Sequence, residues 1–134
     1  MKITELSVPV RVRYVECDPM NVAHHSVYPV WFEMARTELL RQQGEVYREM
    51  EAGGVLFVVA RMNVRYHRPA MYDDELTIHV KALPSAGVKI EHEYKVYRDG
   101  VTLTSAETTL ACVDRDGKLR AIPASLAIES VERG

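Results

Sequence analysis

Apolar and polar residues alternate near the start of the chain, where residues 8–14 read VPVRVRY. A two-residue period of this kind is typical of a half-buried β-strand. The pair Asp18-Pro19 ends the pattern, because the residue before a proline is pushed out of helical geometry and the pair favours a turn. We therefore predict a first strand over 8–14, followed by a loop that carries Asp18.

A helical pattern follows this loop, with apolar residues three and four positions apart. Ser26 can cap the helix start, Pro29 is tolerated in a first turn, and Gly44 can end the helix in a left-handed conformation. We expect the helix to run from about Val27 to Gln43. A broad apolar stripe indicates burial on most sides of the helix. The stripe consists of Tyr28, Val30, Trp31, Phe32, Met34, Ala35 and Leu39.

Glu33, Arg36 and Thr37 are the polar exceptions in this helix. Glu33 and Arg36 lie one turn apart, so they can form an ion pair. Because apolar residues surround Glu33 in the sequence, we expect a buried, paired carboxylate that supports a nearby site.

The spacing of apolar residues changes to two after a short helix predicted over 45–52 and the pair Gly53-Gly54. Asp99-Gly100 predicts a type I′ hairpin, since both central positions of that turn take positive φ. The tail over 123–133 fits a short helix or an edge strand. Further strands are expected at 55–67, 76–83, 88–97 and 101–113.

The predicted order is strand, helix and then four strands, without the alternation that builds a parallel sheet. It indicates an α+β fold in which one antiparallel sheet carries a helix on one face. The length of 134 residues fits a single domain over 1–134.

The composition narrows the classes of partner. The chain is 47% hydrophobic and 27% charged with a net charge of −2, which is ordinary for a globular protein and gives no electrostatic case for nucleic acid or an anionic membrane. It has no apolar run long enough to span a membrane and no secretory signal at its start. Cys17 and Cys112 form neither a CxxC motif nor a disulfide framework, so we expect the cytoplasm.

Two blocks of residues carry a family resemblance. The first is Tyr14-x-Glu16-x-Asp18, then His25-x-x-Tyr28-x-x-Trp31-Phe32-Glu33-x-x-Arg36. The second is Arg65-Tyr66-His67-Arg68-Pro69-Ala70, with Asp73-Asp74-Glu75-Leu76. Together they resemble the hotdog-fold acyl-CoA thioesterases, of which the 4-hydroxybenzoyl-CoA thioesterase type and its bacterial relatives are the nearest group.

The resemblance implies a five-stranded antiparallel sheet wrapped around a long central helix. It also implies a homodimer, often paired into a tetramer, with active sites at the subunit interface. The implied reaction cleaves an acyl-CoA thioester to a carboxylic acid and free coenzyme A, without a metal or redox cofactor. In the family, an Asp at the position of Asp18 attacks the thioester or activates water, and the backbone N–H at the position of His25 polarises the carbonyl.

The chain departs from the family pattern at two positions. Asn21 replaces a usual glycine, and asparagine tolerates positive φ better than most residues, so we expect the turn to survive. His24 replaces a common aromatic residue and can change the polarity of the pocket.

Elementary chemistry agrees with the roles that the resemblance implies. A helix N-terminus supplies free N–H groups and a partial positive charge, which can stabilise a developing oxyanion. Asp18 precedes His25 by seven residues, so its loop can fold back over the helix end, where a carboxylate can form an anhydride or act as a general base. On the residues alone, a turn aspartate beside Pro19 is an equally good interpretation.

Five further residues are candidates for substrate binding. Tyr28 and Trp31 can line an acyl tunnel, although aromatic residues at this spacing are more often core, and Glu33 is the supporting carboxylate. Arg65 and Arg68 lie three positions apart at the end of the strand predicted over 55–67, and both can contact the phosphates of coenzyme A.

Other functions stay open. An acyl-carrier-protein thioesterase would use the same chemistry, and a hotdog dehydratase or hydratase would need its histidine and acid placed differently. A non-catalytic acyl-CoA-binding hotdog module would release no thiol in an assay. No metal is expected, because the histidines lack HxxxH and HExxH spacing. The acyl group, the choice of anhydride or general base, and the choice of dimer or tetramer are not determined.

Overall fold

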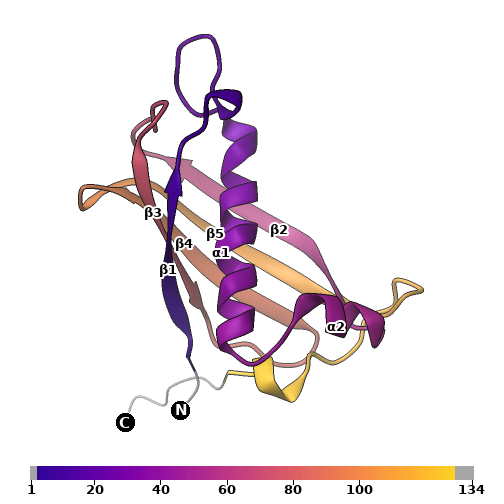
Figure 1. Cartoon of the computed structure of the whole chain (residues 1–134). Coiled ribbons are helices and arrows are strands. Elements are labelled where there is room, and N and C mark those ends of the chain that lie inside the picture. Colours follow the sequence, from indigo (N-terminus) through magenta and orange to yellow (C-terminus); the bar gives the residue numbers. More distant parts are fainter. Residues whose placement is uncertain (1–2, 129–134) are drawn as a thin grey trace.

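The computed structural model describes residues 3–128, in which a curved antiparallel sheet wraps around one long helix (Figure 1). The strand order across the sheet is β1-β3-β4-β5-β2. This confirms the α+β hotdog fold expected from the sequence. The elements are β1 (Glu5–Arg11), α1 (Tyr28–Gln42), α2 (Tyr47–Ala52), β2 (Leu56–Tyr66), β3 (Glu75–Ala82), β4 (Lys89–Arg98) and β5 (Val101–Val113).

The core lies between α1 and the inner face of the sheet. Alternate side chains of β3 and β4 are buried, as the two-residue period predicts. The turn between β4 and β5 has φ of 50° at Asp99 and 79° at Gly100, which confirms the predicted hairpin. Side chains with at most 1% exposure in this core are Val12, Trp31, Phe32, Ala35, Leu39, Ala70, Ile78, Val80, Tyr94, Val96 and Leu103.

The first strand begins and ends three residues earlier than predicted, and the residues after it form a turn. β1 ends at Arg11, and Tyr14–Glu16 form a 3₁₀ turn. The Glu16 carboxylate accepts a hydrogen bond from the Arg13 backbone N–H at 2.7 Å. A side chain that bonds to the backbone offers an alternative to the sheet ladder, which alternation of residue types alone does not reveal.

The helix start also differs from the prediction. A 3₁₀ turn over His25–Val27 precedes α1, and its cap is His24 in place of Ser26. The His24 Nδ1 atom accepts a hydrogen bond from the Ser26 backbone N–H at 3.2 Å. The left-handed helix end was predicted correctly, since Gly44 has a φ of 89°.

The structure describes only part of the tail, for which the sequence left a short helix and an edge strand open. Ala124–Leu126 form a 3₁₀ turn, and Ile128 pairs with Ser85 in an isolated bridge. The rest of the predicted segment 123–133 lies outside the described residues. Within residues 3–128, none of the helices combines the length and apolar character needed to cross a membrane.

Candidate active site

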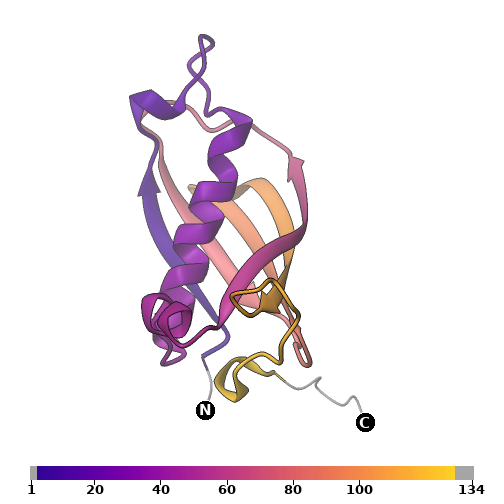
Figure 2. The ribbon, with the colours of Figure 1, turned by 90° about the vertical axis from the view of Figure 1, so that its right-hand side faces the viewer.

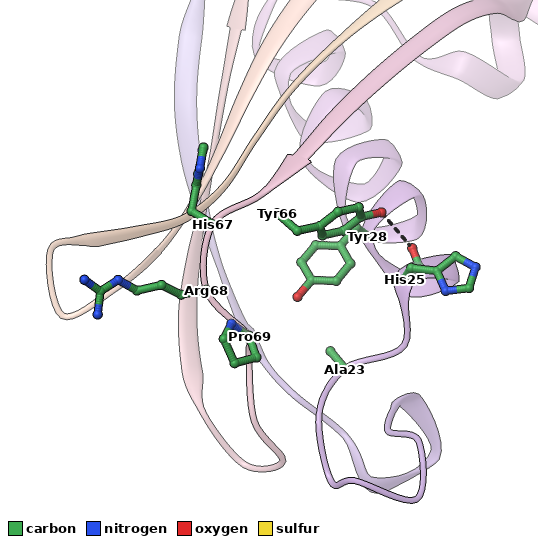
Figure 3. Close-up of a pocket in the computed structure, with 7 residues that line it drawn as sticks. All are labelled: Ala23, His25, Tyr28, Tyr66, His67, Arg68 and Pro69. Atoms are coloured by element: carbon green, nitrogen blue, oxygen red, sulfur yellow. Dashed lines mark hydrogen bonds between the residues drawn. The ribbon is translucent and has the colours of Figure 1, made fainter.

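A cavity of about 270 Å³ lies at the N-terminal end of the central helix (Figure 3). Two segments far apart in the sequence form it: the loop before α1 together with the first turn of α1, and the residues at and after the end of β2. Its lining residues are Ala23, His25, Tyr28, Tyr66, His67, Arg68 and Pro69. The cavity therefore places the positive end of a helix beside a basic residue.

His25 lies at the start of the 3₁₀ turn and lines this cavity. Its backbone N–H forms no hydrogen bond with any residue of the 3–128 range. Its carbonyl oxygen accepts a hydrogen bond from the Tyr66 hydroxyl at 3.4 Å, drawn as the dashed line in Figure 3. The His24 ring stacks on the His25 ring with centroids 4.1 Å apart. The His24 cap and the contact between the two rings therefore stabilise the turn. The His25 backbone N–H at the cavity is left unpaired within residues 3–128.

Two tyrosine rings lie side by side in the cavity. The Tyr28 and Tyr66 rings meet edge to face with centroids 5.1 Å apart. Burial raises the pKa of Tyr28, so its hydroxyl stays protonated at neutral pH. Trp31 does not line this cavity; it is 1% exposed and packs edge to face behind Tyr28. Of the two residues expected to contact the acyl group, Tyr28 therefore lines the cavity and Trp31 lies in the core behind it.

Asp18 belongs to the segment between β1 and α1, part of which extends past the start of α1 as a narrow loop (Figure 1). Its Oδ1 atom accepts hydrogen bonds from the backbone N–H groups of Met20 at 2.8 Å and Val22 at 3.5 Å. Asn21 completes the turn with a φ of 66°, as its tolerance of positive φ predicted. Asp18 shares the helix end with His25, but it does not line the cavity and forms no hydrogen bond with His25.

Glu16 joins the Asp18 loop to the helix, a role that the sequence alone did not indicate. Its side chain is 6% exposed and accepts a hydrogen bond from the Trp31 indole N–H at 3.2 Å. Its backbone carbonyl accepts one from the His24 N–H at 2.9 Å. Glu16 therefore fixes both sides of the loop that carries Asp18. Its position in the Tyr14-x-Glu16-x-Asp18 pattern was the one signal available.

Glu33 is not the buried, paired carboxylate that its apolar neighbours suggested. It is exposed on α1 and forms no ion pair within the described part of the chain. Arg36, the expected partner, is instead the buried member at 8% exposure, and it donates to the Tyr94 hydroxyl at 2.9 Å. The prediction failed because the apolar stripe is centred on Phe32 and Ala35, which turns Glu33 toward solvent.

The two candidate arginines lie in different places. Arg68 lines the cavity, and its side chain points away from the tyrosine rings in Figure 3. Arg65 lies on the outer face of the sheet, in a second hollow of about 200 Å³ that Lys95 and Ser105 also line. Lys95 was not a candidate, because its position beside Arg65 depends on the pairing of both β2 and β4 with β5.

No group of three or more His, Cys, Asp or Glu side chains in the described range 3–128 is arranged to hold a metal ion.

Comparisons with known proteins agree with the fold described above. The family model of the thioesterase-like superfamily matches residues 12–129. The acyl-CoA thioester hydrolase YbgC of Escherichia coli O6:H1 is 34% identical over 131 residues, which cover 96% of this chain and 98% of the relative. The acyl-CoA thioesterase YbgC of Haemophilus influenzae is 33% identical, with 87% of this chain and 85% of the relative covered.

A solved structure shares the fold. The DHNA-CoA thioesterase of Staphylococcus aureus superposes with a TM-score of 0.85 at 26% identity, and the match covers 89% of this chain and 81% of that one. The chain therefore belongs to the thioesterase-like superfamily.

Proposed function

We propose that the chain is an acyl-CoA thioester hydrolase whose reaction takes place where the Asp18 loop meets the cavity at the start of α1. The observation that carries the proposal is the unpaired backbone N–H of His25 at that cavity. A free donor at the positive end of a helix stabilises the oxyanion that forms when a thioester carbonyl is attacked. The relatives named as acyl-CoA thioester hydrolases support the choice of substrate.

Asp18 is the proposed nucleophile or general base. As a nucleophile, its carboxylate attacks the thioester carbonyl and expels the coenzyme A thiolate, and water then hydrolyses the mixed anhydride. As a general base, it takes a proton from the water that attacks the same carbonyl. Both routes consume one water and yield a carboxylic acid and a thiol. Neither route uses a metal or redox cofactor, and the ring of His25 has no required part.

The remaining candidates are assigned by their positions relative to the cavity. Tyr28 contacts the acyl group, while Trp31 supports Tyr28 from the core. Arg68 at the cavity and Arg65 on the outer face contact the phosphates of coenzyme A, because guanidinium groups pair well with phosphate oxygens. Glu33 does not line the cavity; it lies with Val30 and Met34 on the exposed surface of α1, so it is assigned no contact with the substrate.

We also propose a homodimer formed along β2. This strand has eleven residues and a free edge in the sheet order, and long exposed apolar edges are normally covered. Its exposed apolar residues are Val58, Val59, Met62 and Tyr66. Pairing of two dimers into a tetramer would use the α1 surface where Val30 and Met34 are 50% and 48% exposed. A second copy beside β2 would lie next to the cavity.

The cytoplasm is the proposed location, since Cys17 and Cys112 are both free thiols.

A thiol-release screen over short, long and aromatic acyl-CoA thioesters tests the proposed reaction. We expect hydrolysis of at least one class by the wild-type chain. Loss of that activity in Asp18→Asn would support the mechanism, and full activity in this variant would refute it. Binding of acyl-CoA without any thiol release would identify a binding module in place of an enzyme. Sedimentation equilibrium tests the dimer, which a monomeric mass would contradict.

A further inference from the structure

Arg36 places a positive charge inside the fold that the proposed reaction does not use. It lies eight residues after Tyr28 on α1, which corresponds to about 12 Å along the helix axis. Its side chain is buried, and its Nη1 atom donates to the Tyr94 hydroxyl at 2.9 Å. No carboxylate among residues 3–128 forms an ion pair with it. Buried charges are normally paired, so this guanidinium lacks an anionic partner.

Polar groups continue from Arg36 across the inner face of the sheet. The Tyr94 hydroxyl lies 2.7 Å from the Thr108 hydroxyl, and both residues are at most 3% exposed. His92 is 2% exposed beside Tyr94, and its Nδ1 atom has no hydrogen-bond partner in the described residues. Burial, aided by the charge of Arg36, lowers the pKa of His92 to about 3, so its imidazole is neutral at pH 7. This polar cluster of Arg36, His92, Tyr94 and Thr108 therefore carries one net positive charge.

The nearby carboxylates do not neutralise this charge. Glu33 and Glu51 affect the pKa of the Tyr47 hydroxyl together with Arg36, so they lie in the same region. Both side chains are exposed, and neither forms an ion pair with Arg36. Water screens exposed charges of this kind, so within residues 3–128 the guanidinium has a hydroxyl partner but no anionic one.

The polar cluster borders the same side of the sheet as the cavity. Thr108 pairs with Met62 of β2, and Thr104 pairs with Tyr66, which lines the cavity. Directly paired residues of antiparallel strands face the same side, so Met62 and Tyr66 both lie on the inner face. They are 43% and 52% exposed. In the single chain the inner face is therefore exposed at two points of β2, with the half-buried Val64 between them, and a partner in the proposed homodimer would border this strip. Figure 2 shows β2 running beside α1.

We propose that Arg36, Tyr94 and Thr108 bind a carboxylate at the far end of the acyl group, so that the preferred substrates are ω-carboxyacyl thioesters of coenzyme A. The inference rests on the proposed thioesterase function and specifies its substrate class. A guanidinium fork matches a carboxylate with two parallel hydrogen bonds. The distance of about 12 Å along α1 calls for an extended acyl chain between the reacting carbonyl and the carboxylate.

The test compares two series of coenzyme A thioesters with equal numbers of carbon atoms. One series carries a terminal carboxylate, and the other ends in a methyl group. At the best chain length we expect kcat/KM of the wild-type chain to be about tenfold or more higher for the carboxylate, as one hydrogen bond to a charged group provides. The advantage should reside mainly in KM, because the carboxylate lies far from the reacting bond.

Variants separate recognition of the carboxylate from general structural damage. Tyr94→Phe and Thr108→Val should reduce the preference for the carboxylate, and Arg36→Met should abolish it, while each keeps activity on the methyl-ended series. Thr109→Val is the matched control, because Thr109 lies on the outer face, where its hydroxyl donates to Glu91 at 3.4 Å. This control should keep the wild-type preference. If Arg36→Met does not fold, the two milder variants still decide the question.

Three outcomes would overturn the inference. An equal or higher kcat/KM of the wild-type chain for the methyl-ended series would remove the proposed substrate class but leave the thioesterase function intact. Equal losses on both series in Tyr94→Phe and Thr108→Val would assign the polar cluster a purely structural role. Hydrolysis of neither series, nor of any other acyl-CoA, would refute the proposed function and this inference with it.

Discussion

Replacing Glu16 with alanine should destabilise the fold and disturb the loop that carries Asp18. The Glu16 carboxylate accepts hydrogen bonds from the Arg13 backbone N–H at 2.7 Å, the Trp31 indole N–H at 3.2 Å and the Arg13 guanidinium at 3.3 Å. Glu16→Ala leaves the Trp31 donor unpaired at a position that is 1% exposed.

The expected magnitude follows from these three contacts. An unpaired buried donor costs about 1–3 kcal/mol, and the lost bond to the Arg13 backbone adds about 1 kcal/mol. The Arg13 side chain is 69% exposed, so its ion pair with Glu16 contributes little. We therefore expect the free energy of unfolding to fall by about 2–4 kcal/mol.

Urea unfolding of four proteins measures this effect: wild type, Glu16→Ala, Trp31→Phe and the double variant. The double-mutant cycle should give a coupling energy of about 1 kcal/mol between the two side chains. Glu16→Gln keeps one acceptor oxygen and should lose less stability than Glu16→Ala. A loss below about 0.5 kcal/mol in Glu16→Ala, the range of ordinary surface substitutions, would refute the reasoning.

Three further predictions concern single side chains. The pKa of His92 is lowered to about 3, so between about pH 6.5 and pH 3 the unfolded chain binds a proton that the folded chain does not, and the unfolding free energy falls as the pH drops through this range. The loss is up to about 1.4 kcal/mol per pH unit. The slope of unfolding free energy against pH should be shallower in His92→Phe, and an unchanged slope would contradict this. Asn21→Gly should keep thioesterase activity, whereas Asn21→Val should lower it, because a β-branched residue is strained at a φ of 66°; equal activities would show that this turn does not position Asp18. His24→Ala removes the acceptor that caps the Ser26 N–H and should lower the unfolding free energy, measured by urea unfolding, by about 1 kcal/mol. An unchanged unfolding free energy would show that this cap does not stabilise the helix start.

The arrangement of strands and helix could be predicted from local patterns. The two-residue period over β3 and β4, the Asp99-Gly100 pair and the glycine after α1 each depend on neighbouring residues only. The first strand and the helix cap were predicted less well. Both errors arose where a side chain, Glu16 or His24, bonds to the backbone nearby. Residue propensities do not report such bonds, since they depend on the conformation already adopted.

The site was harder to predict than the fold, because its residues converge through tertiary structure. The resemblance named the loop of Asp18 and the helix start at His25, and the structure brings both to one end of the fold. The place of Lys95 beside Arg65 depends on strand register across β5, which one sequence does not reveal. Glu33 is exposed and Arg36 is buried, the reverse of the expectation for Glu33, because burial on α1 depends on the rotation of the helix. Phe32 is 0% exposed although the next residue, Glu33, faces solvent.

The ratio of steady-state kcat values for His25→Ala and Asp18→Asn tests the central claim most directly. If the backbone N–H at His25 and the carboxylate of Asp18 perform the reaction, His25→Ala should keep activity within about tenfold of wild type, because alanine retains the N–H donor. Asp18→Asn should lose about 100-fold or more, as expected for removal of a nucleophile or general base. A His25→Ala variant that is slower than Asp18→Asn would contradict the account.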